Sequence, residues 1–172
     1  EEMFIREKLE YVLDFHERTF DREAAAELTK YLESSSEGDN STLHKVTIHS
    51  SFKQVTWGDL EVERITEPVI DIRELETYTG SFRLEYIAAT REGRERTYYH
   101  VREYYRIRYT PERMYLLDFD REMTQIFDET ADVYANDKII LGIVDQEVEM
   151  QESDGGNVFA FVSSGKLYSY NV

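Results

Sequence analysis

Apolar residues recur at helical spacing in the first part of the chain. In residues 3–18 the repeat is close to 3.6 residues, which predicts an amphipathic helix with one buried face. That face carries four apolar residues and one histidine: Ile5, Leu9, Val12, Leu13 and His16. Asp21 has the residue type of a helix N-cap and predicts a second helix over 22–34. The serine-rich stretch 34–41 then predicts a loop that ends the helical part.

After residue 42 the dominant period changes from that of a helix to that of a strand. The clearest case is 97–109, with five Tyr, one Val and one Ile, and neither Gly nor Pro. Aromatic and β-branched residues favour strands, and alternate side chains point to opposite faces. One face, which we expect to be core, then carries Tyr99, Val101, Glu103, Tyr105, Ile107 and Tyr109. The other carries Tyr98, His100, Arg102, Tyr104, Arg106 and Arg108.

Other alternating stretches predict an antiparallel meander on either side of 97–109. Strands are predicted over 43–52, 60–65, 69–72, 81–90 and 114–119, with a break at Pro68 and turns at Gly58-Asp59 and Thr79-Gly80. A short helix over 122–134, a strand over 138–150 and a hairpin of 158–163 with 166–170 follow.

Helices followed by a run of strands are typical of an α+β fold, with helices packed on one side of a sheet. We therefore expect one α+β domain over 1–172, in which 1–36 is helical. A curved antiparallel sheet is expected over 42–120, and a helix plus strands over 121–172.

A hairpin register follows if Glu92-Gly93 is the two-residue turn between 81–90 and 97–109. Two inner pairs are then predicted, Tyr86 with Tyr99 and Leu84 with Val101. Three outer pairs are predicted as well: Ile87 with Tyr98, Glu85 with His100, and Arg83 with Arg102. Because Arg83 and Arg102 carry like charges, we expect a third group from an acidic neighbouring strand or from a partner protein. On the inner face we expect Phe82, Leu84, Tyr86, Tyr99, Val101 and Tyr105 to be buried together.

Charge narrows the classes of partner. The net charge is −16, yet residues 91–108 contain six Arg and three Glu, so this segment is basic in an acidic chain. The acidic remainder argues against nucleic acid and anionic membranes, since both need a basic surface. The absence of cysteine excludes disulfides, thiolate metal sites and cysteine nucleophiles. No apolar run approaches the ~20 residues of a membrane span. Any anchor is expected upstream of Glu1, because the chain starts without Met.

Motifs that bind cofactors or metals are not found in the sequence. There is no glycine-rich phosphate loop and no nucleophile elbow. His44 and His49 fall on opposite faces of one predicted strand, so they are not expected to share a metal. The stretch 118–154 has twelve acids and two bases but lacks a calcium-loop spacing. We interpret it as a solvated surface and expect no cofactor and no metal.

The layout as a whole resembles a known group of folds. Two helices (FIREKLEYVLDFHERTF, then DREAAAELTKYLESS) lead into an antiparallel run that ends YYHVREYYRIRY. Over residues 3–110 this order resembles the cystatin-like and nuclear-transport-factor-2-like folds. Among them it is similar to the extracytoplasmic domain of the assembly-factor subunit of type IV secretion and conjugation machines. The resemblance implies a scaffold without catalytic residues, held outside the cytoplasm by a membrane anchor that precedes the domain.

Two classes of function remain open. The first is a non-enzymatic scaffold that binds protein partners or further copies of itself. Its expected interaction surface combines seven residues: Arg83, Tyr98, His100, Arg102, Tyr104, Arg106 and Arg108. The second is a small-molecule binding protein or enzyme with a pocket between helices and sheet, for which the candidate acid/base groups are His16, Glu103, and Glu85 with His100. A deep pocket with a buried ionisable pair favours the second class, and an interior filled by Phe and Tyr favours the first.

Overall fold

The computed structural model describes residues 3–35, 40–92, 95–126, 134–135, 138–139, 150–152, 158–163 and 166–171. Within these residues the chain has an α+β fold, as the sequence predicts. The helices are α1 (Ile5–Thr19), α2 (Arg22–Ala25), a 3-10 helix (Ala26–Tyr31) and α3 (Phe52–Val55).

Two details of the helical part differ in how well the sequence anticipated them. Asp21 is the expected cap, since its side chain accepts hydrogen bonds from the backbone N–H groups of Glu23 and Ala24. The second helix is shorter than predicted and continues as a 3-10 helix.

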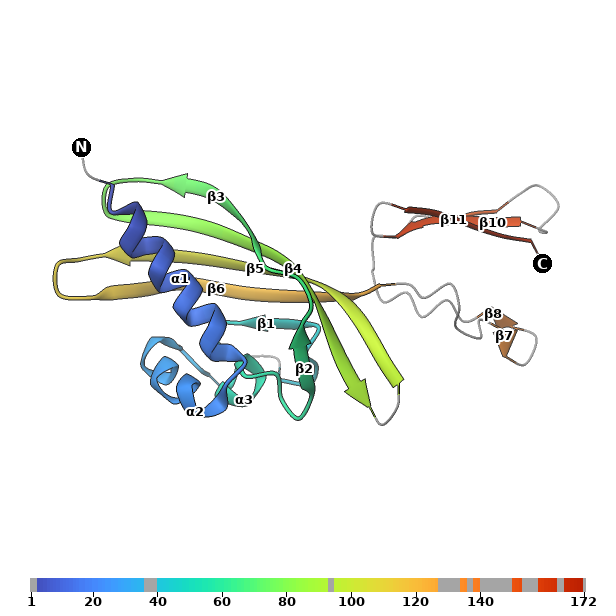
Figure 1. The fold of residues 1–172 in the computed structure, drawn as a ribbon, viewed down its shortest axis with the longest axis horizontal. Coiled ribbons are helices and arrows are strands. Elements are labelled where there is room, and N and C mark those ends of the chain that lie inside the picture. Colours follow the sequence, from blue (N-terminus) through green and yellow to red (C-terminus); the bar gives the residue numbers. More distant parts are fainter. Residues whose placement is uncertain are drawn as a thin grey trace.

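Six strands form one open antiparallel sheet (Figure 1). They are β1 (Lys45–Thr47), β2 (Glu61–Arg64), β3 (Val69–Leu75), β4 (Thr79–Glu92), β5 (Glu95–Tyr109) and β6 (Met114–Gln125). The order is β1-β6-β5-β4, and both β2 and β3 pair with the other edge of β4. Pro68 lies between β2 and β3, so the predicted break is confirmed.

Three local predictions are wrong. The strand expected over 43–52 is only three residues long, because the Ser51 side chain caps α3 instead. Thr79 and Gly80 belong to β4 and not to a turn. The helix expected over 122–134 is wrong at its start, where residues 122–125 extend β6 in its ladder with β5. Tyr134, at its end, lies in a strand, and residues 127–133 are outside the described residues.

Further strands follow in the C-terminal part. β7 (Tyr134–Ala135) pairs with β8 (Lys138–Ile139). β10 (Val158–Ser163) pairs with both β11 (Lys166–Asn171) and β9 (Met150–Glu152). Of the strand predicted over 138–150, only the two ends are described, and both are in strands. Most of the acidic stretch 118–154 falls outside the described residues.

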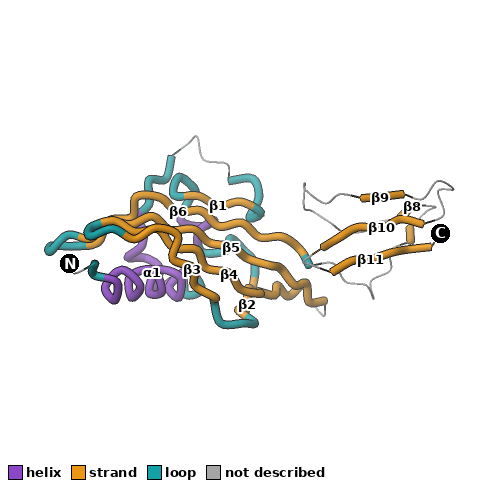
Figure 2. The backbone as a smooth tube through the Cα atoms, turned by 90° about the horizontal axis from the view of Figure 1, so that it is seen from above, coloured by secondary structure: helices purple, strands orange, loops and turns teal. Residues whose placement is uncertain are grey.

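The core lies between the helices and one face of the six-stranded sheet. α1 runs across the strands (Figure 1), and Figure 2 shows it edge-on against the sheet. Val12 and Phe15 of α1 pack with Ala25, Leu28 and Val55 of the other helices against the inner sheet residues. The predicted inner face is confirmed for five residues that are 2% exposed or less: Phe82, Leu84, Tyr86, Val101 and Tyr105. Tyr99, the sixth, is only partly buried.

The predicted hairpin register is wrong by two residues. Glu92 pairs with Glu95, so residues 93–94 lie between the strand ends instead of 92–93. Glycine is favoured as the first of two turn residues in one common hairpin class, which the sequence reading overlooked. Tyr86 faces Val101 and Leu84 faces Glu103, while Ile87 faces His100, Glu85 faces Arg102 and Arg83 faces Tyr104. A shift of two residues keeps every side chain on its predicted face, so the face assignment survives although the pairs do not.

Candidate functional site

The structure brings together two of the acid/base candidates. His16 of α1 and Glu103 of β5 are joined by a hydrogen bond of 2.8 Å between Nδ1 and Oε2. Both side chains are 0% exposed. The helical period places His16 on the buried face of α1, and strand alternation places Glu103 on the inner face of β5. The two local patterns therefore meet in the core.

Three further side chains complete the hydrogen bonds of this pair. The hydroxyls of Tyr86 and Tyr105 each donate a hydrogen bond of 2.7 Å to Glu103. Arg64 Nη1 lies 3.1 Å from His16 Nε2. Because a guanidinium can only donate, Nε2 accepts, and the ring proton on Nδ1 is donated to Glu103.

The neighbouring groups shift the pKa values of Glu103, Tyr86 and Tyr105. Burial acts to raise the pKa of Glu103, but the interaction with His16, the charge of Arg121 and the Tyr105 hydroxyl outweigh it, so the pKa lies below its usual value. Burial and the neighbouring Glu103 carboxylate raise the pKa values of Tyr86 and Tyr105 well above the usual value. The cluster is a buried carboxylate surrounded by protonated donors.

Arg121 supplies the positive charge. It lies opposite Glu103 in the β5–β6 ladder and is 0% exposed. Its Nη1 and Nη2 donate hydrogen bonds of 2.9 Å to the backbone oxygens of Val55 and Gln54, respectively. Its guanidinium carbon lies 3.5 Å from the centre of the Trp57 ring. The sequence analysis missed Arg121, although strand alternation continued beyond Phe119 would have placed it on the inner face.

This cluster is sealed inside the fold. The ring centroids of Tyr105 and Phe119 lie 5.5 and 5.2 Å from that of Phe15. A general acid or base must come within hydrogen-bond reach of its substrate. In this conformation the side chains of His16 and Glu103 are both 0% exposed, so solvent does not reach the pair directly.

Six of the seven predicted interaction residues belong to β5 and one to β4, and alternation places them on the opposite, outer face of the sheet. Arg83 Nε and Arg102 Nε lie 3.0 and 3.5 Å from Glu85 Oε1. His100 Nε2 lies 3.5 Å from Glu85 Oε2, and Arg83 Nη2 also lies 3.0 Å from Asp71. The Glu85–His100 contact is therefore diagonal and partly exposed. Carboxylates of the same chain therefore contact Arg83, His100 and Arg102, which form one half of the basic stripe made by the seven predicted residues.

The other half of the stripe differs. Among the described residues, Arg106 and Arg108 have no carboxylate oxygen within 4.0 Å. The guanidinium carbons of Arg108 and Arg113 lie 4.9 and 4.1 Å from the centre of the Tyr115 ring. We call Arg106, Arg108, Arg113 and Tyr115 the basic end. Asp118 lies opposite Arg106 in the ladder, where the acidic residues of β6 begin.

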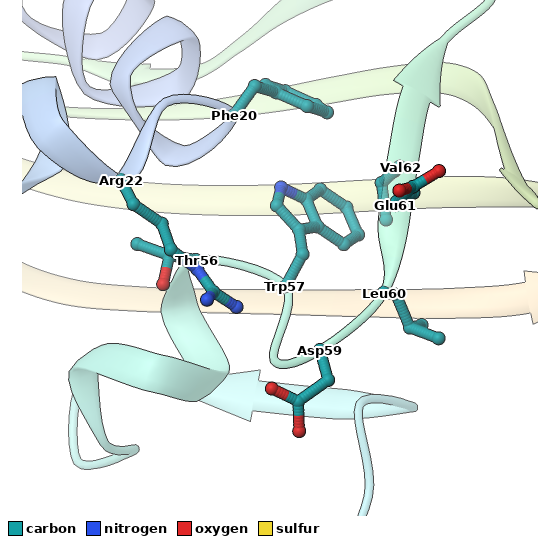
Figure 3. Close-up of a pocket in the computed structure, with 8 residues that line it drawn as sticks. All are labelled: Phe20, Arg22, Thr56, Trp57, Asp59, Leu60, Glu61 and Val62. Atoms are coloured by element: carbon teal, nitrogen blue, oxygen red, sulfur yellow. The ribbon is translucent and has the colours of Figure 1, made fainter.

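A pocket of about 340 Å³ opens on the helix side of the sheet, beside β2 (Figure 3). Eight residues line it: Phe20, Arg22, Thr56, Trp57, Asp59, Leu60, Glu61 and Val62. Trp57 is 2% exposed, and within the described structure its Nε1 has no hydrogen-bond partner. The backbone φ angles of Trp57 and Gly58 are 65° and 61°, in the left-handed region. The sequence placed Trp57 next to a turn but gave no sign of a pocket.

Two classes of site were searched for in the described part of the chain. No group of three or more His, Asp or Glu side chains there could hold a metal ion. No described helix is both long enough and apolar enough to cross a membrane.

Comparisons with known proteins give no relative for this chain. No protein-family model matches it, and neither a characterised protein nor a solved structure shows significant similarity to it.

Proposed function

We propose that the chain is a non-enzymatic interaction domain, which binds a protein partner through the outer, helix-free face of its sheet. One observation supports this most directly. The ionisable cluster on the helix side is closed around Glu103, whereas Arg106, Arg108 and Arg113 are exposed and, in the part of the chain that the structure describes, have no carboxylate oxygen within 4.0 Å. The groups that could act as acid or base are buried, and the arginines that could bind a partner are exposed.

The composition of the basic end fits a protein interface. Arginine and tyrosine are enriched at the residues that contribute most to protein–protein affinity. Arg108 and Arg113 both approach Tyr115, so the tyrosine ring and two guanidinium groups form one surface. Guanidinium groups bind carboxylates with two parallel hydrogen bonds, which favours an acidic segment as the ligand.

The partner is therefore a protein that presents an acidic segment, and electrostatic attraction speeds its approach. A second copy of this strongly acidic chain also meets that description. The layout resemblance extends the proposal to a component of a membrane-anchored secretion or conjugation complex, in which such domains assemble with other subunits.

The test uses the full chain and a double variant of the basic end, Arg106→Glu with Arg108→Glu. The matched control changes the same charge on the helix side, at the exposed residues Arg6 and Lys30. Sedimentation velocity measures self-association, and affinity capture with quantitative mass spectrometry identifies other partners, whose Kd is then measured with purified protein.

We expect the basic-end variant to weaken the complex about tenfold or more, which corresponds to about 1.4 kcal/mol. The control should bind like the wild type. An equal loss in both double variants would reject the outer face as the binding surface. A wild-type chain that stays monomeric and captures no partner would reject the proposed function itself.

A further inference from the structure

We infer that the pocket beside Trp57 binds a small, planar, uncharged molecule that carries a hydrogen-bond acceptor, such as an aromatic amide. The site lies on the helix side at the β2 edge, whereas the proposed protein interface lies on the outer face. The inference is therefore independent of the proposed function, and each can fail without the other.

The pocket has the size and lining of a small-ligand site. Its volume of about 340 Å³ lies near the lower end of the ~300–1,000 Å³ range of ligand pockets. Phe20, Leu60 and Val62 give it apolar walls around the indole of Trp57 (Figure 3). Four of the eight lining residues are apolar or aromatic and four are polar or charged, which suits a small ligand that combines one ring with a polar group.

An unused donor supplies the polar contact. Buried indole N–H groups usually find a hydrogen-bond partner, and leaving one unmade is costly. Among the described residues none accepts from Trp57 Nε1, although the side chain is 2% exposed. In Figure 3 the nitrogen lies on the edge of the indole that is directed toward the side of Phe20 and Arg22. A carbonyl oxygen of the ligand would complete this hydrogen bond.

The donor is held in place before any ligand arrives. The Arg121 guanidinium lies 3.5 Å from the ring centre, and two backbone carbonyls fix that guanidinium. The Phe20 ring centroid lies 5.2 Å from that of Trp57. Trp57 itself has a left-handed φ of 65°, a strained conformation that residues with side chains adopt mainly where function or packing demands it. Such preorganisation lowers the entropic cost of binding.

The charges at the rim favour an uncharged ligand. Asp59 is paired with Lys53 over 2.6 Å. Arg22 and Glu61 line the rim with opposite charges and are both exposed. Since the Nε1 atom exposes less than 1 Å², the ligand reaches it after the exposed Arg22 side chain turns aside. Phe20 keeps its ring contacts with His16, Trp57 and Tyr86.

Trp57 is the only tryptophan of the chain, so one indole N–H signal in a proton–nitrogen NMR spectrum reports on this site alone. The probe is benzamide, titrated to millimolar concentration into the full chain. Toluene, which has a similar ring but no acceptor, is the control ligand. We expect benzamide to give a saturable downfield shift of the indole proton and toluene to give no downfield shift.

Matched variants locate the binding. Val62→Phe fills the pocket and should abolish the benzamide response, while Val69→Phe places the same change on β3 at a valine that is 71% exposed and should leave it intact. Leu60→Arg, at a lining residue that is 43% exposed, gives a second blocking variant if Val62→Phe does not fold. The inference is overturned if benzamide gives no saturable shift. It is equally overturned if the folded blocking variants respond like the wild type.

Discussion

Glu103 is a carboxylate in the middle of an apolar sheet face. A buried charge is tolerated only when it is paired and fully hydrogen-bonded. Here His16 and two tyrosine hydroxyls bind the two carboxylate oxygens, and Arg121 lies opposite in the next strand. Each buried polar group depends on the others for a hydrogen bond or for charge balance, so the cluster acts as a unit.

Replacing Glu103 by Gln should therefore destabilise the fold strongly. The change keeps the shape but removes the carboxylate charge that His16 and the two tyrosine hydroxyls bind, and breaking such a buried pair costs about 3–5 kcal/mol. Urea unfolding followed by circular dichroism measures the loss. Glu122→Gln is the control, because its pair with Lys45 is exposed and is worth less than about 1 kcal/mol. Equal losses for the two variants would contradict the role given to Glu103.

Asp120 predicts a pH dependence of the opposite kind from that of a paired carboxylate. Burial and the neighbouring Glu122 raise its pKa from 3.8 to about 6, against the opposing effect of Lys45. The folded state therefore binds the proton more tightly than the unfolded state, and stability falls as the pH rises between about 4 and 6. Asp120→Asn should remove this fall and raise the stability at pH 7, measured by thermal unfolding across the pH range. An unchanged pH profile would show that Asp120 is not responsible.

The sequence could place individual residues on faces but could not pair them. His16 and Glu103 were both identified from local periodicity, since period alone decides which face a side chain takes. Their contact joins positions 87 residues apart, and nothing in a local pattern specifies that distance. The Trp57 pocket was missed for the same reason, because it depends on α3 docking against β6. Alternation along β6 would have placed Arg121 on the inner face, but not in contact with α3.

At the scale of elements, Lys8 holds α1 against the sheet. The side chain is 0% exposed, and its Nζ donates to the backbone oxygens of Glu76, Thr77 and Thr79 over 2.5, 3.1 and 2.9 Å. These carbonyls lie where the chain passes from β3 to β4. Lys8 therefore joins the first turn of α1 to the connection between β3 and β4, which is distant from the helix in sequence.

Substituting Lys8 by Met should loosen this contact. The three partly buried carbonyls lose a charged donor, for which we expect a loss of more than about 2 kcal/mol of unfolding free energy. Arg6→Met is the control on the same helix, because Arg6 is exposed and should change stability by less than about 0.5 kcal/mol. Chemical denaturation of both variants provides the comparison. If Lys8→Met unfolds at the same denaturant concentration as Arg6→Met, the contact contributes little.

Long, regular elements were the ones that the sequence predicted well. α1, β4 and β5 carry sustained periodicity over fourteen or fifteen residues. Shorter elements depended on their surroundings. Residues 43–52 alternate like a strand, yet the Ser51 cap and the turn between Thr47 and Ser50 divide them into β1 and α3. Residues 122–125 have a helical pattern but pair with β5, because a neighbouring strand end outweighs local propensity.

The whole molecule is layered unevenly: the helices pack on one sheet face, and strand pairing is concentrated in the middle of the sheet. β5 is paired along most of its length on both sides, whereas β1, β2 and β3 are at edges. Protection from solvent depends on how many neighbours hold an element in place. The sheet should therefore open from its edges inward.

Hydrogen exchange should show this gradient. Amides of β5 are expected to exchange most slowly, followed by those of β4 and β6, while amides of β1 and β2 exchange first. Exchange measured by mass spectrometry on peptides from each strand tests the order. Slower exchange in β2 than in β5 would contradict it.

The polar contacts of α1 also impose an order on biosynthesis. His16 is synthesised before its partner Glu103 and before Arg121, which follow only after about a hundred further residues; this takes about 5–20 s at ordinary rates of synthesis. During this interval the helix carries an apolar face with nothing to cover it, next to a lysine and a histidine that lack their final partners. Although α1 is made before the sheet strands, it is therefore among the last of these elements to complete its native contacts.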